Sequence, residues 1–180
     1  MDSVRALIQK QTSWFEEWVV VGSPLKNDGA KPVLFCHHPH GCCAIGASAV
    51  GTQVATAKEP CRGLVAPLVF NLPICRQLFE MVGNLPADPE TVKHAMRDER
   101  RDLVIIPGGV EEVVLTSPDH ERAYINARKG FIKYALQFGY DLVPVYHFGE
   151  TQMFHPIYPQ VCSKELRACK RDCEDYCKDD

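Results

Sequence analysis

The sequence predicts a single α/β domain with a largely parallel or mixed sheet flanked by helices. Short apolar runs of strand length alternate along the chain with segments of helical periodicity, the pattern typical of this fold class. Polar or glycine-containing motifs directly follow three of these runs, and functional residues in such sheets gather at the carboxyl ends of the strands. With 180 residues, 46% of them hydrophobic, the chain can bury one core. We therefore expect one domain, spanning residues 31–150.

An amphipathic helix is expected before this domain, over residues 1–21. Its apolar face is rich in aromatic residues: Val4, Leu7, Ile8, Trp14, Phe15, Trp18 and Val19. Trp is favoured at bilayer interfaces, but the polar face carries two Glu and little Lys or Arg. Docking on the domain is therefore favoured over lying in a membrane surface. Residues 22–31 follow as a loop.

The first strand of the domain begins at the apolar run 33–35 and is followed by the segment Cys-His-His-Pro-His-Gly at 36–41. Residues 44–57 are mostly small, apolar and free of proline, so they predict a helix. The histidines are thus expected where a strand gives way to a helix. The unpaired N–H groups and partial positive charge of a helix N-terminus suit a developing oxyanion and help to keep an imidazole neutral.

Two residues of this segment restrict the backbone around His40. Pro39 limits the residue before it to an extended conformation, and Gly41 permits a sharp turn or a close approach to a ligand. Together they are expected to fix the direction of the His40 side chain.

The next two elements are a strand and a short helix. Residues 64–70 predict a strand that Pro67 interrupts, and residues 72–82 predict a helix. Five residues of this helix are expected to face inward: Leu72, Cys75, Leu78, Phe79 and Val82.

A second helix and a buried strand follow. Asp88 is a strong candidate N-cap, because Pro89 stands at the first helical position and Glu90 in the first turn, and the helix should run to about Arg100. Residues 103–106 form an apolar run of strand length that ends at Pro-Gly-Gly.

The last elements of the domain repeat this alternation. Residues 124–128 are polar and predict a loop, and a helical face ends at Gly139: Phe131, Tyr134, Ala135 and Phe138. Residues 142–146 predict another buried strand. The remaining segment, 160–180, is a charged tail that carries cysteines and is expected to be a solvated helix or a disordered end.

Composition excludes several classes of protein. The net charge of −3 and the lack of a run of Lys and Arg give no footprint for nucleic acid. No stretch reaches the roughly 18 apolar residues of a membrane-spanning helix, and the N-terminus lacks the apolar core of a signal peptide. Nine scattered cysteines, an odd number, indicate reduced thiols.

A metal-binding module is the alternative from a different class. Several potential ligands lie close together in the sequence: Cys36, His37, His38, His40, Cys42 and Cys43. Adjacent residues of an extended chain point in opposite directions, however, so few of them share one ion. Four tail cysteines lack the Cys-x-x-Cys spacing of structural zinc sites: Cys162, Cys169, Cys173 and Cys177. Cys42 or Cys43 beside His40 offers a further alternative, a nucleophile that forms an acyl-enzyme.

Three motifs, in order, resemble the type-2 diacylglycerol acyltransferase family, which includes monoacylglycerol and wax alcohol acyltransferases. They are His-Pro-His-Gly at 38–41, Pro-Gly-Gly-Val-Glu-Glu at 107–112, and the block from Arg-Lys-Gly-Phe to Phe-Gly-Glu at 128–150. The resemblance implies a glycerolipid-acyltransferase-like fold and transfer of a fatty acyl group from acyl-CoA to the hydroxyl of a neutral lipid, with diacylglycerol the favoured acceptor. It also implies a membrane surface as partner, at the cytosolic face of the endoplasmic reticulum, and no bound cofactor.

Carried over by position, the resemblance implies that His40 is the general base and Glu112 its acidic partner. Further expected substrate contacts are His38, Gly108, Gly109, Arg128, Lys129 and Glu150. Independently of the resemblance, the backbone N–H groups of Gly41 and Cys42 are expected to be oxyanion donors at the helix start. The chemistry agrees, because attack by an alcohol on a thioester needs a base near neutral pKa, and CoA phosphates need cations.

This chain departs from the wider superfamily at one position and from its own family at both ends. The Asp that other glycerolipid acyltransferases have five residues after the His is here Ile45, so we expect Glu112 to orient the imidazole. Hydrophobic segments before the histidine motif and further strands after Phe-Gly-Glu, usual in the family, are not evident. We therefore expect an incomplete domain, which leaves a catalytically inactive fragment as an alternative. The sequence does not indicate an oligomeric state.

Overall fold

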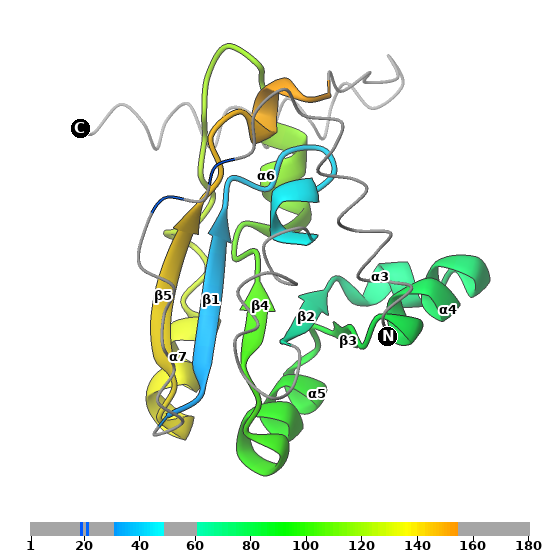
Figure 1. The fold of residues 1–180 in the computed structure, drawn as a ribbon, viewed down its shortest axis with the longest axis vertical. Coiled ribbons are helices and arrows are strands. Elements are labelled where there is room, and N and C mark those ends of the chain that lie inside the picture. Colours follow the sequence, from blue (N-terminus) through cyan, green and yellow to red (C-terminus); the bar gives the residue numbers. More distant parts are fainter. Residues whose placement is uncertain (1–18, 20, 22–30, 49–60, 155–180) are drawn as a thin grey trace.

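A computed structural model describes residues 19, 21, 31–48 and 61–154 (Figure 1). Within them, five parallel strands form one sheet in the order β3-β2-β4-β1-β5, with helices beside it. The predicted single α/β domain with a parallel sheet is therefore confirmed. Almost all of the expected N-terminal helix, and the whole of the tail at 160–180, lie outside the described residues.

The strands are short and their bounds differ from the expected ones by a few residues. They are β1 Val33–His38, β2 Arg62–Val65, β3 Leu85–Pro86, β4 Leu103–Ile105 and β5 Asp141–Tyr146. The helices are α3 Pro67–Phe70, α4 Pro73–Met81, α5 Pro89–His94, η1 Ala95–Glu99, α6 Gly109–Leu115, α7 Gly130–Phe138 and η2 Glu150–Gln152. Residues 45–48 are also helical, as expected for the start of the predicted helix at 44–57.

Strand β1 is an inner strand of the sheet, and the histidine segment follows it. It pairs with β4 on one side and with β5 on the other, so Leu34 lies opposite both Leu103 and Leu142. Because all three strands are parallel, the segments that follow them meet at one edge of the sheet. The histidine segment after β1 therefore lies between the segment after β4 and the segment after β5 (Figure 1).

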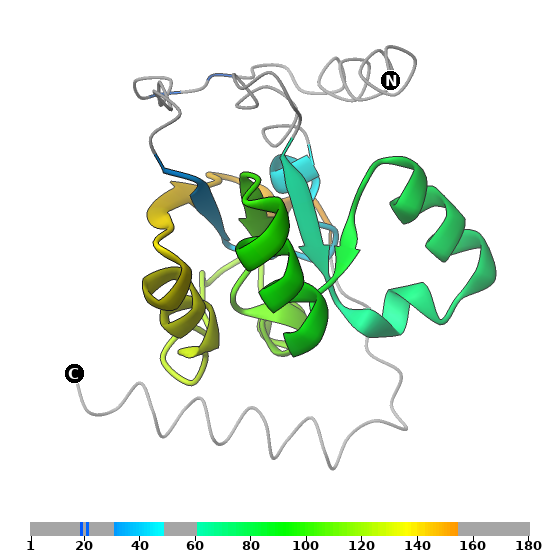
Figure 2. The same ribbon diagram turned by 90° about the horizontal axis from the view of Figure 1, so that it is seen from below.

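The main core lies between the sheet and the helices α5, η1 and α7, which lie side by side (Figure 2). Its buried members are Leu34, Cys36, Leu64, Val92, Ala95, Met96, Leu103, Ala135 and Tyr140. A smaller cluster consists of alternate residues of β1, Val33 and Phe35, together with Val104 of β4. Burial of β1 on both faces explains why its apolar run is continuous rather than alternating.

Asp88 caps helix α5 as predicted, since its Oδ1 accepts the amides of Glu90 and Thr91 at 3.2 and 3.0 Å. The chain continues through η1 to Arg100, which has a left-handed φ of 50° and ends the helix where the sequence indicates.

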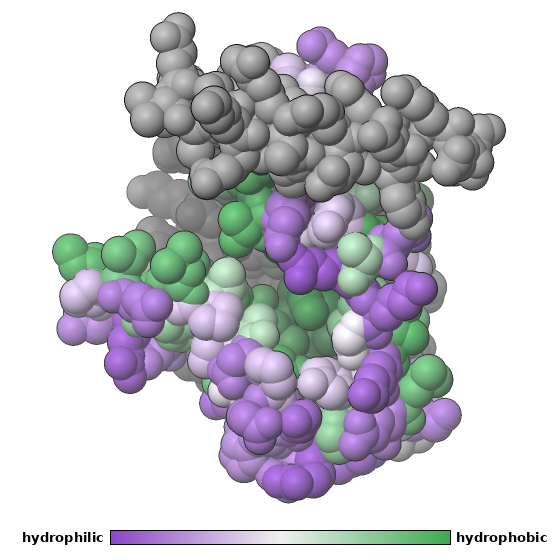
Figure 3. Space-filling view, turned by 180° about the vertical axis from the view of Figure 1, so that it is seen from behind, coloured by the Kyte–Doolittle hydropathy of each residue, from purple (hydrophilic) through white to green (hydrophobic). Residues whose placement is uncertain are grey.

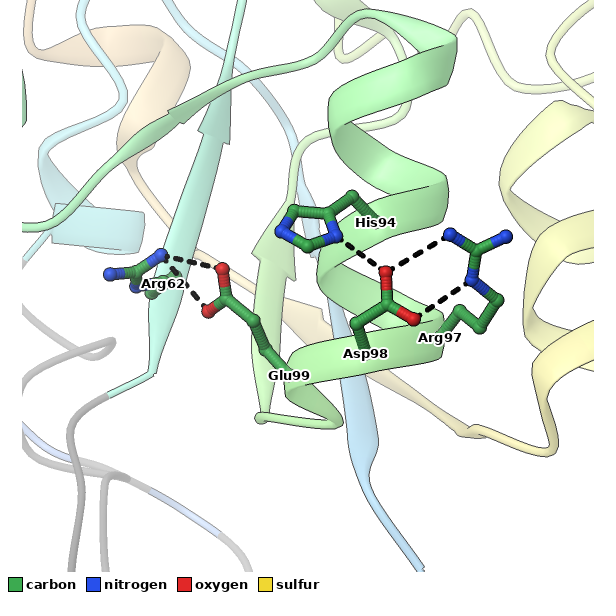
Figure 4. Close-up of polar contacts among 5 residues, drawn as sticks. All are labelled: Arg62, His94, Arg97, Asp98 and Glu99. Carbon is green, nitrogen blue, oxygen red and sulfur yellow. Dashed lines mark hydrogen bonds and ion pairs between the residues drawn. The ribbon is translucent and has the colours of Figure 1, made fainter.

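Ion pairs fix the end of this helical segment. Arg62 on β2 pairs with Glu99 of η1, with Nη1 3.0 Å from Oε2, and Asp98 binds both Arg97 and His94 (Figure 4).

The predicted strand over residues 64–70 was wrong beyond Val65. Pro67 begins helix α3 instead, because proline has no N–H for a sheet ladder but its fixed φ suits the first turn of a helix. The inward positions expected for the next helix were also wrong in part. Leu72, Leu78 and Val82 are exposed, because α3 and α4 form a hairpin that projects away from the sheet (Figure 2).

Strand β5 was expected to be buried, and it is not. Leu142 and Tyr146 are 39% and 47% exposed, because β5 has only one neighbouring strand among the described residues. The sequence also gave no sign of β3, which is two residues long, or of α6. Among the described residues no helix is both long and apolar enough to cross a membrane.

The Asp88 cap yields a first prediction. Asp88→Ala removes the acceptor of two amides at the start of α5 and should lower the free energy of unfolding by about 1 kcal/mol. Asp88→Asn keeps an accepting oxygen and should stay within a few tenths of a kcal/mol of the wild type. Urea titration followed by circular dichroism measures both. Equal stabilities of the two variants would contradict the capping role.

Candidate active site

The turn after β1 presents His40 at the carboxyl edge of the sheet. Its ring is half-buried, and Gly41 follows with a φ of +61°, which permits the sharp turn expected from the sequence. A side chain at Gly41 would also collide with Glu150, since a Cβ there would lie 2.9 Å from Glu150 Cγ. The helix begins at Ile45, so the expectation that Gly41 and Cys42 stand at its start was wrong by about three residues.

Glu112 is the most buried carboxylate at this edge, with 1% of its surface exposed. Its Oε1 accepts the backbone amide of His40 at 2.6 Å and its Oε2 accepts the amide of Tyr124 at 2.8 Å. The sequence correctly brought Glu112 beside the histidine segment. The expected contact was wrong, however: the described hydrogen bonds join Glu112 to the main chain of His40 and not to its ring.

The ring of His40 finds a different partner. Its Nδ1 lies 3.1 Å from the carbonyl oxygen of Gly41. A carbonyl only accepts hydrogen bonds, so in the neutral ring the proton sits on Nδ1 and the lone pair sits on Nε2. This tautomer suits a general base, and the main chain sets it without a carboxylate.

His38 occupies the space between β1 and Glu112. Its Nδ1 is buried 3.8 Å from Glu112 Oε1, a distance within the range of an ion pair but too long for a hydrogen bond. Burial would raise the pKa of Glu112, but the His38 ring and the amides of Tyr124 and His40 outweigh it and lower that pKa. Glu112 is therefore ionised at neutral pH.

The glycine pair after β4 makes room for this carboxylate. A Cβ at Gly108 would collide with Glu112 Oε2, and Gly109 has a φ of +60°, which disfavours other residues. The substrate contacts expected of Gly108 and Gly109 remain predictions, since a tight turn that admits Glu112 accounts for both.

Glu150 is a second buried carboxylate that accepts two backbone amides, as Glu112 does, and we call each of these arrangements a clamp. It follows β5, on the other side of β1 from Glu112. Its Oε1 accepts the amide of Ile45 at 2.8 Å and its Oε2 accepts the amide of Gly46 at 2.9 Å. These amides belong to the first turn of the helix, where donors lack partners within the helix. Burial raises the pKa of Glu150 to about 7, although the two amides oppose the shift.

Sequence reasoning missed a histidine pair beside this carboxylate, formed by buried His37 and half-buried His147. The Nδ1 of His37 lies 2.7 Å from the Nε2 of His147, and the rings are stacked with centroids 4.9 Å apart. Burial lowers their pKa values to about 3 and 4, respectively, so both rings are neutral and one donates to the other. Only the pairing of β1 with β5 brings them together, and no local pattern reveals that pairing.

The histidine pair also packs tightly against the start of the helix. A Cβ at Gly46 would lie 2.5 Å from His147 Nδ1 and 2.6 Å from Glu150 Oε2. The amide of His147 donates to the carbonyl of His38 at 2.7 Å. His147 therefore links β5, β1 and the helix at residue 45.

The two basic residues expected near CoA differ in their surroundings. Arg128 pairs with Glu111 of α6 and lies 5.7 Å from the centroid of the Tyr124 ring. Lys129 is exposed and directly precedes α7. The charge of Arg128 is thus already balanced within the protein.

The structure offers little support for metal or thiol chemistry at this edge. No three His, Cys, Asp or Glu side chains within residues 31–48 and 61–154 are grouped to hold a metal ion. The Cys42 thiol donates to the carbonyl of Phe154 at 3.5 Å, and burial followed by the charge of Cys43 raises its pKa. Cys42 is therefore a poor nucleophile at neutral pH. The four tail cysteines lie outside the described residues.

The raised pKa of Glu150 predicts a pH-dependent stability. Between pH 4.5 and about 7 the unfolded chain ionises this carboxyl while the folded protein keeps it protonated, so stability falls as pH rises, by up to roughly 3 kcal/mol. Glu150→Gln does not titrate. The melting temperature of the wild type relative to this variant should therefore drop between pH 5 and pH 8 in differential scanning fluorimetry. Exposed Glu121→Gln serves as the control, and a constant difference between wild type and Glu150→Gln would refute the assignment.

Comparison with known proteins agrees with the motifs at this edge. Residues 9–178 match the family model described as diacylglycerol acyltransferase. The chain is 31% identical over 140 residues to human diacylglycerol O-acyltransferase 2, an alignment that covers 73% of this chain and 35% of the relative.

Two further relatives give similar values. Human diacylglycerol O-acyltransferase 2-like protein 6 is 31% identical over 130 residues, covering 68% of this chain and 39% of the relative. Bovine 2-acylglycerol O-acyltransferase 1 is 33% identical over 138 residues, covering 72% and 41%. The chain thus spans well under half the length of these relatives. No solved structure matches it. Because the family model covers nearly the whole sequence, the chain belongs to the diacylglycerol acyltransferase family.

Proposed function

We propose that this chain carries an acyl-CoA-dependent O-acyltransferase centre that moves a fatty acyl group to the hydroxyl of a neutral lipid. The favoured acceptor is diacylglycerol, which would give triacylglycerol. The observation that carries the proposal is the 3.1 Å contact between Nδ1 of His40 and the carbonyl oxygen of Gly41, from which we infer that Nε2 is left as the base. Family membership supplies the reaction class, and relatives named for acylation of diacylglycerol and of 2-acylglycerol supply the acceptor class.

In the proposed reaction, Nε2 of His40 removes the proton of the lipid hydroxyl as its oxygen attacks the thioester carbonyl. The carbonyl oxygen becomes an oxyanion, the tetrahedral intermediate collapses, and the C–S bond breaks. The proton on the imidazolium then passes to the CoA thiolate, so the base is regenerated. The products are the new ester and free CoA, and no further co-reactant is needed.

Glu112 takes part as a positioning residue in this scheme. It holds the amide of His40 at 2.6 Å and its negative charge lies near the histidine segment, where the imidazolium forms. Glu112 therefore still acts together with His40 in this scheme, but through a hydrogen bond from the backbone amide of His40 and not from its ring. His38 lies next to the same carboxylate and is proposed to support its position.

The donors for the oxyanion are proposed to be the amides of Gly41 and Cys42. Those of Ile45 and Gly46 are unsuitable, because Glu150 already accepts both. One such donor typically contributes about 3 to 4 kcal/mol to a transition state. For the CoA phosphates, exposed Lys129 is a better candidate than Arg128, whose charge Glu111 balances.

The natural setting of this reaction is proposed to be the cytosolic face of the endoplasmic reticulum membrane, where both substrates meet. The alternative is an inactive fragment, since the chain spans only 35 to 41% of the relatives it matches. An activity assay separates the two. The chain is expressed in membranes and incubated with radiolabelled acyl-CoA and a panel of diacylglycerol, monoacylglycerol and long-chain alcohol.

The base is tested first. His40→Ala should reduce labelled ester by at least about 100-fold, because general-base catalysis contributes roughly 10²- to 10⁴-fold. His38→Ala should cost less, since His38 supports the carboxylate without touching substrate in this scheme. Thin-layer chromatography of the lipid products measures both. A His40→Ala variant that is folded and fully active would refute the proposed base, and a wild type that is silent with every acceptor would favour the inactive fragment.

The clamp is tested by Glu112→Gln, with exposed Glu121→Gln as the control, because Glu111 balances the charge of Arg128. A glutamine at 112 offers only one accepting oxygen for two amides, so its NH₂ group would face an N–H donor, at a cost of about 1 to 3 kcal/mol. We expect acyl transfer to fall about 10-fold or more for Glu112→Gln and to change little for Glu121→Gln. Activity at 112 that matches the wild type would contradict the positioning role.

A further inference from the structure

The α3–α4 hairpin, residues 67–82, exposes an unusual concentration of large apolar side chains. Neither helix contains a buried residue. Six apolar side chains of this hairpin are between 41 and 75% exposed: Leu68, Leu72, Ile74, Leu78, Met81 and Val82. Exposed apolar residues scattered singly need no explanation, but a contiguous group on one element usually marks an interaction site.

Three of these six residues form one face of α4, distinct from the side that packs on α3. Ile74, Leu78 and Met81 are spaced four and three residues apart, so they line one side of the helix. Half-buried Phe79 contacts Phe70 with ring centroids 6.3 Å apart, which joins the two helices. The apolar face is therefore surplus to the packing of the hairpin itself.

The opposite side of α4 is polar and internally neutral. Arg76 Nε lies 2.8 Å from Glu80 Oε1, and both side chains are at least half exposed. Figure 3 shows the result: hydrophobic side chains gather along the upper side of the projecting hairpin, and hydrophilic ones along its lower side. Such a division allows a helix to lie in an interface between water and an apolar phase, with apolar area rather than basic residues as the driving force.

The apolar face points the same way as the candidate active site. Strand β2 runs parallel to β1 within the sheet, and α3 begins at Pro67, two residues after β2 ends. The hairpin thus leaves the sheet at its carboxyl edge, the edge that carries His40. In the ribbon view the strands point upward, and in the rear view the hydrophobic side of the hairpin also faces upward (Figures 1 and 3).

We propose that the α3–α4 hairpin inserts its apolar face into the surface of a lipid bilayer and so turns the His40 edge of the sheet toward that bilayer. The choice of lipid as the occupant rests on the proposed function, because the acceptor alcohol is dissolved in a membrane and must enter at this edge. The form of the surface agrees, since a short projecting ridge fits the acyl boundary of a bilayer to a depth of about 5 to 10 Å.

The hairpin carries no net positive charge, which indicates that it does not require anionic lipid. Its Arg76 is paired with Glu80, and the chain as a whole has a net charge of −3. Attraction to anionic lipid therefore contributes little, and insertion is driven by apolar area. Binding should need no anionic lipid and should change little with salt.

The experiment is flotation of the full chain with vesicles of phosphatidylcholine containing diacylglycerol, without acyl-CoA. The variant Ile74→Ser/Leu78→Ser/Met81→Ser should lower the partition coefficient by roughly 10-fold or more. The matched control is Leu136→Ser, because Leu136 on α7 is 79% exposed but lies outside the hairpin. It should bind like the wild type, and 0.1 and 0.5 M salt should give about the same result.

A second measurement reports the depth of insertion. In a Trp14→Phe/Trp18→Phe background, a tryptophan introduced by Leu78→Trp should shift to shorter emission wavelength and be quenched by brominated lipid. One introduced by Leu136→Trp should do neither. Equal flotation of the wild type and the triple variant, or an unquenched tryptophan at 78, would overturn the proposal. So would a triple variant that floats normally but no longer self-associates, since the hairpin would then bind a second copy.

Failure of this proposal is distinguishable from failure of the proposed function. His40→Ala should float like the wild type, because membrane binding does not depend on the base. An active chain that floats equally well with and without the three hairpin substitutions would refute only the role of the hairpin in membrane binding. A chain that floats through the hairpin but transfers no acyl group would refute only the chemistry.

Discussion

The candidate site depends on one constraint: the turn after an inner strand of a parallel sheet needs acceptors for those of its backbone amides that are buried. The turn after β1 lies between the segments that follow β4 and β5, and only part of it is exposed to solvent. Two buried carboxylates supply the acceptors, one from each neighbour. Glu112 takes the amide of His40, and Glu150 takes those of Ile45 and Gly46. An unpaired buried amide would cost about 1 to 3 kcal/mol, so the two clamps fix the path of the turn.

The two clamps are chemically similar but electrostatically different. The pKa of Glu112 is lowered because the His38 ring and two amides together outweigh burial, whereas burial dominates at Glu150 and raises its pKa to about 7. The neighbouring histidine pair adds no charge, since burial keeps His37 and His147 neutral. The fixed negative charge therefore stands on the Glu112 side of the turn, beside His38 and the amide of His40.

Sequence patterns predicted the parts of this arrangement that depend on local chemistry. The parallel α/β fold, the Asp88 cap and the end of α7 at Gly139 follow from alternation, capping and glycine at a left-handed position. The predicted neighbourhood of Glu112 and the histidine segment also followed, because motifs after parallel strands converge.

The errors arose where tertiary contacts decide the outcome. No local signal distinguishes a carboxylate that meets an imidazole from one that meets the amide of the same residue, as Glu112 does. The His37–His147 pair depends on which strands are neighbours, and the exposure of β5 on its place at an edge. Leu72, Leu78 and Val82 were expected inward, because a helical stripe reports only that one side of a helix is apolar. The 3.6-residue period does not distinguish a side covered by a protein core from one covered by lipid.

Glu112 binds the backbone of His40 rather than its ring, so the path of the turn does not depend on the side chain at position 40. A carboxylate bound to an imidazole would lose its partner whenever the histidine is replaced, and the turn would then relax. Here Glu112 binds the amide of residue 40, which every residue except proline provides. The ring is held independently, by the carbonyl of Gly41. Replacement of the base therefore leaves the clamp, the Gly108 turn that admits it and the path of the chain unchanged, so the chemistry can be removed without disturbing the fold that presents it.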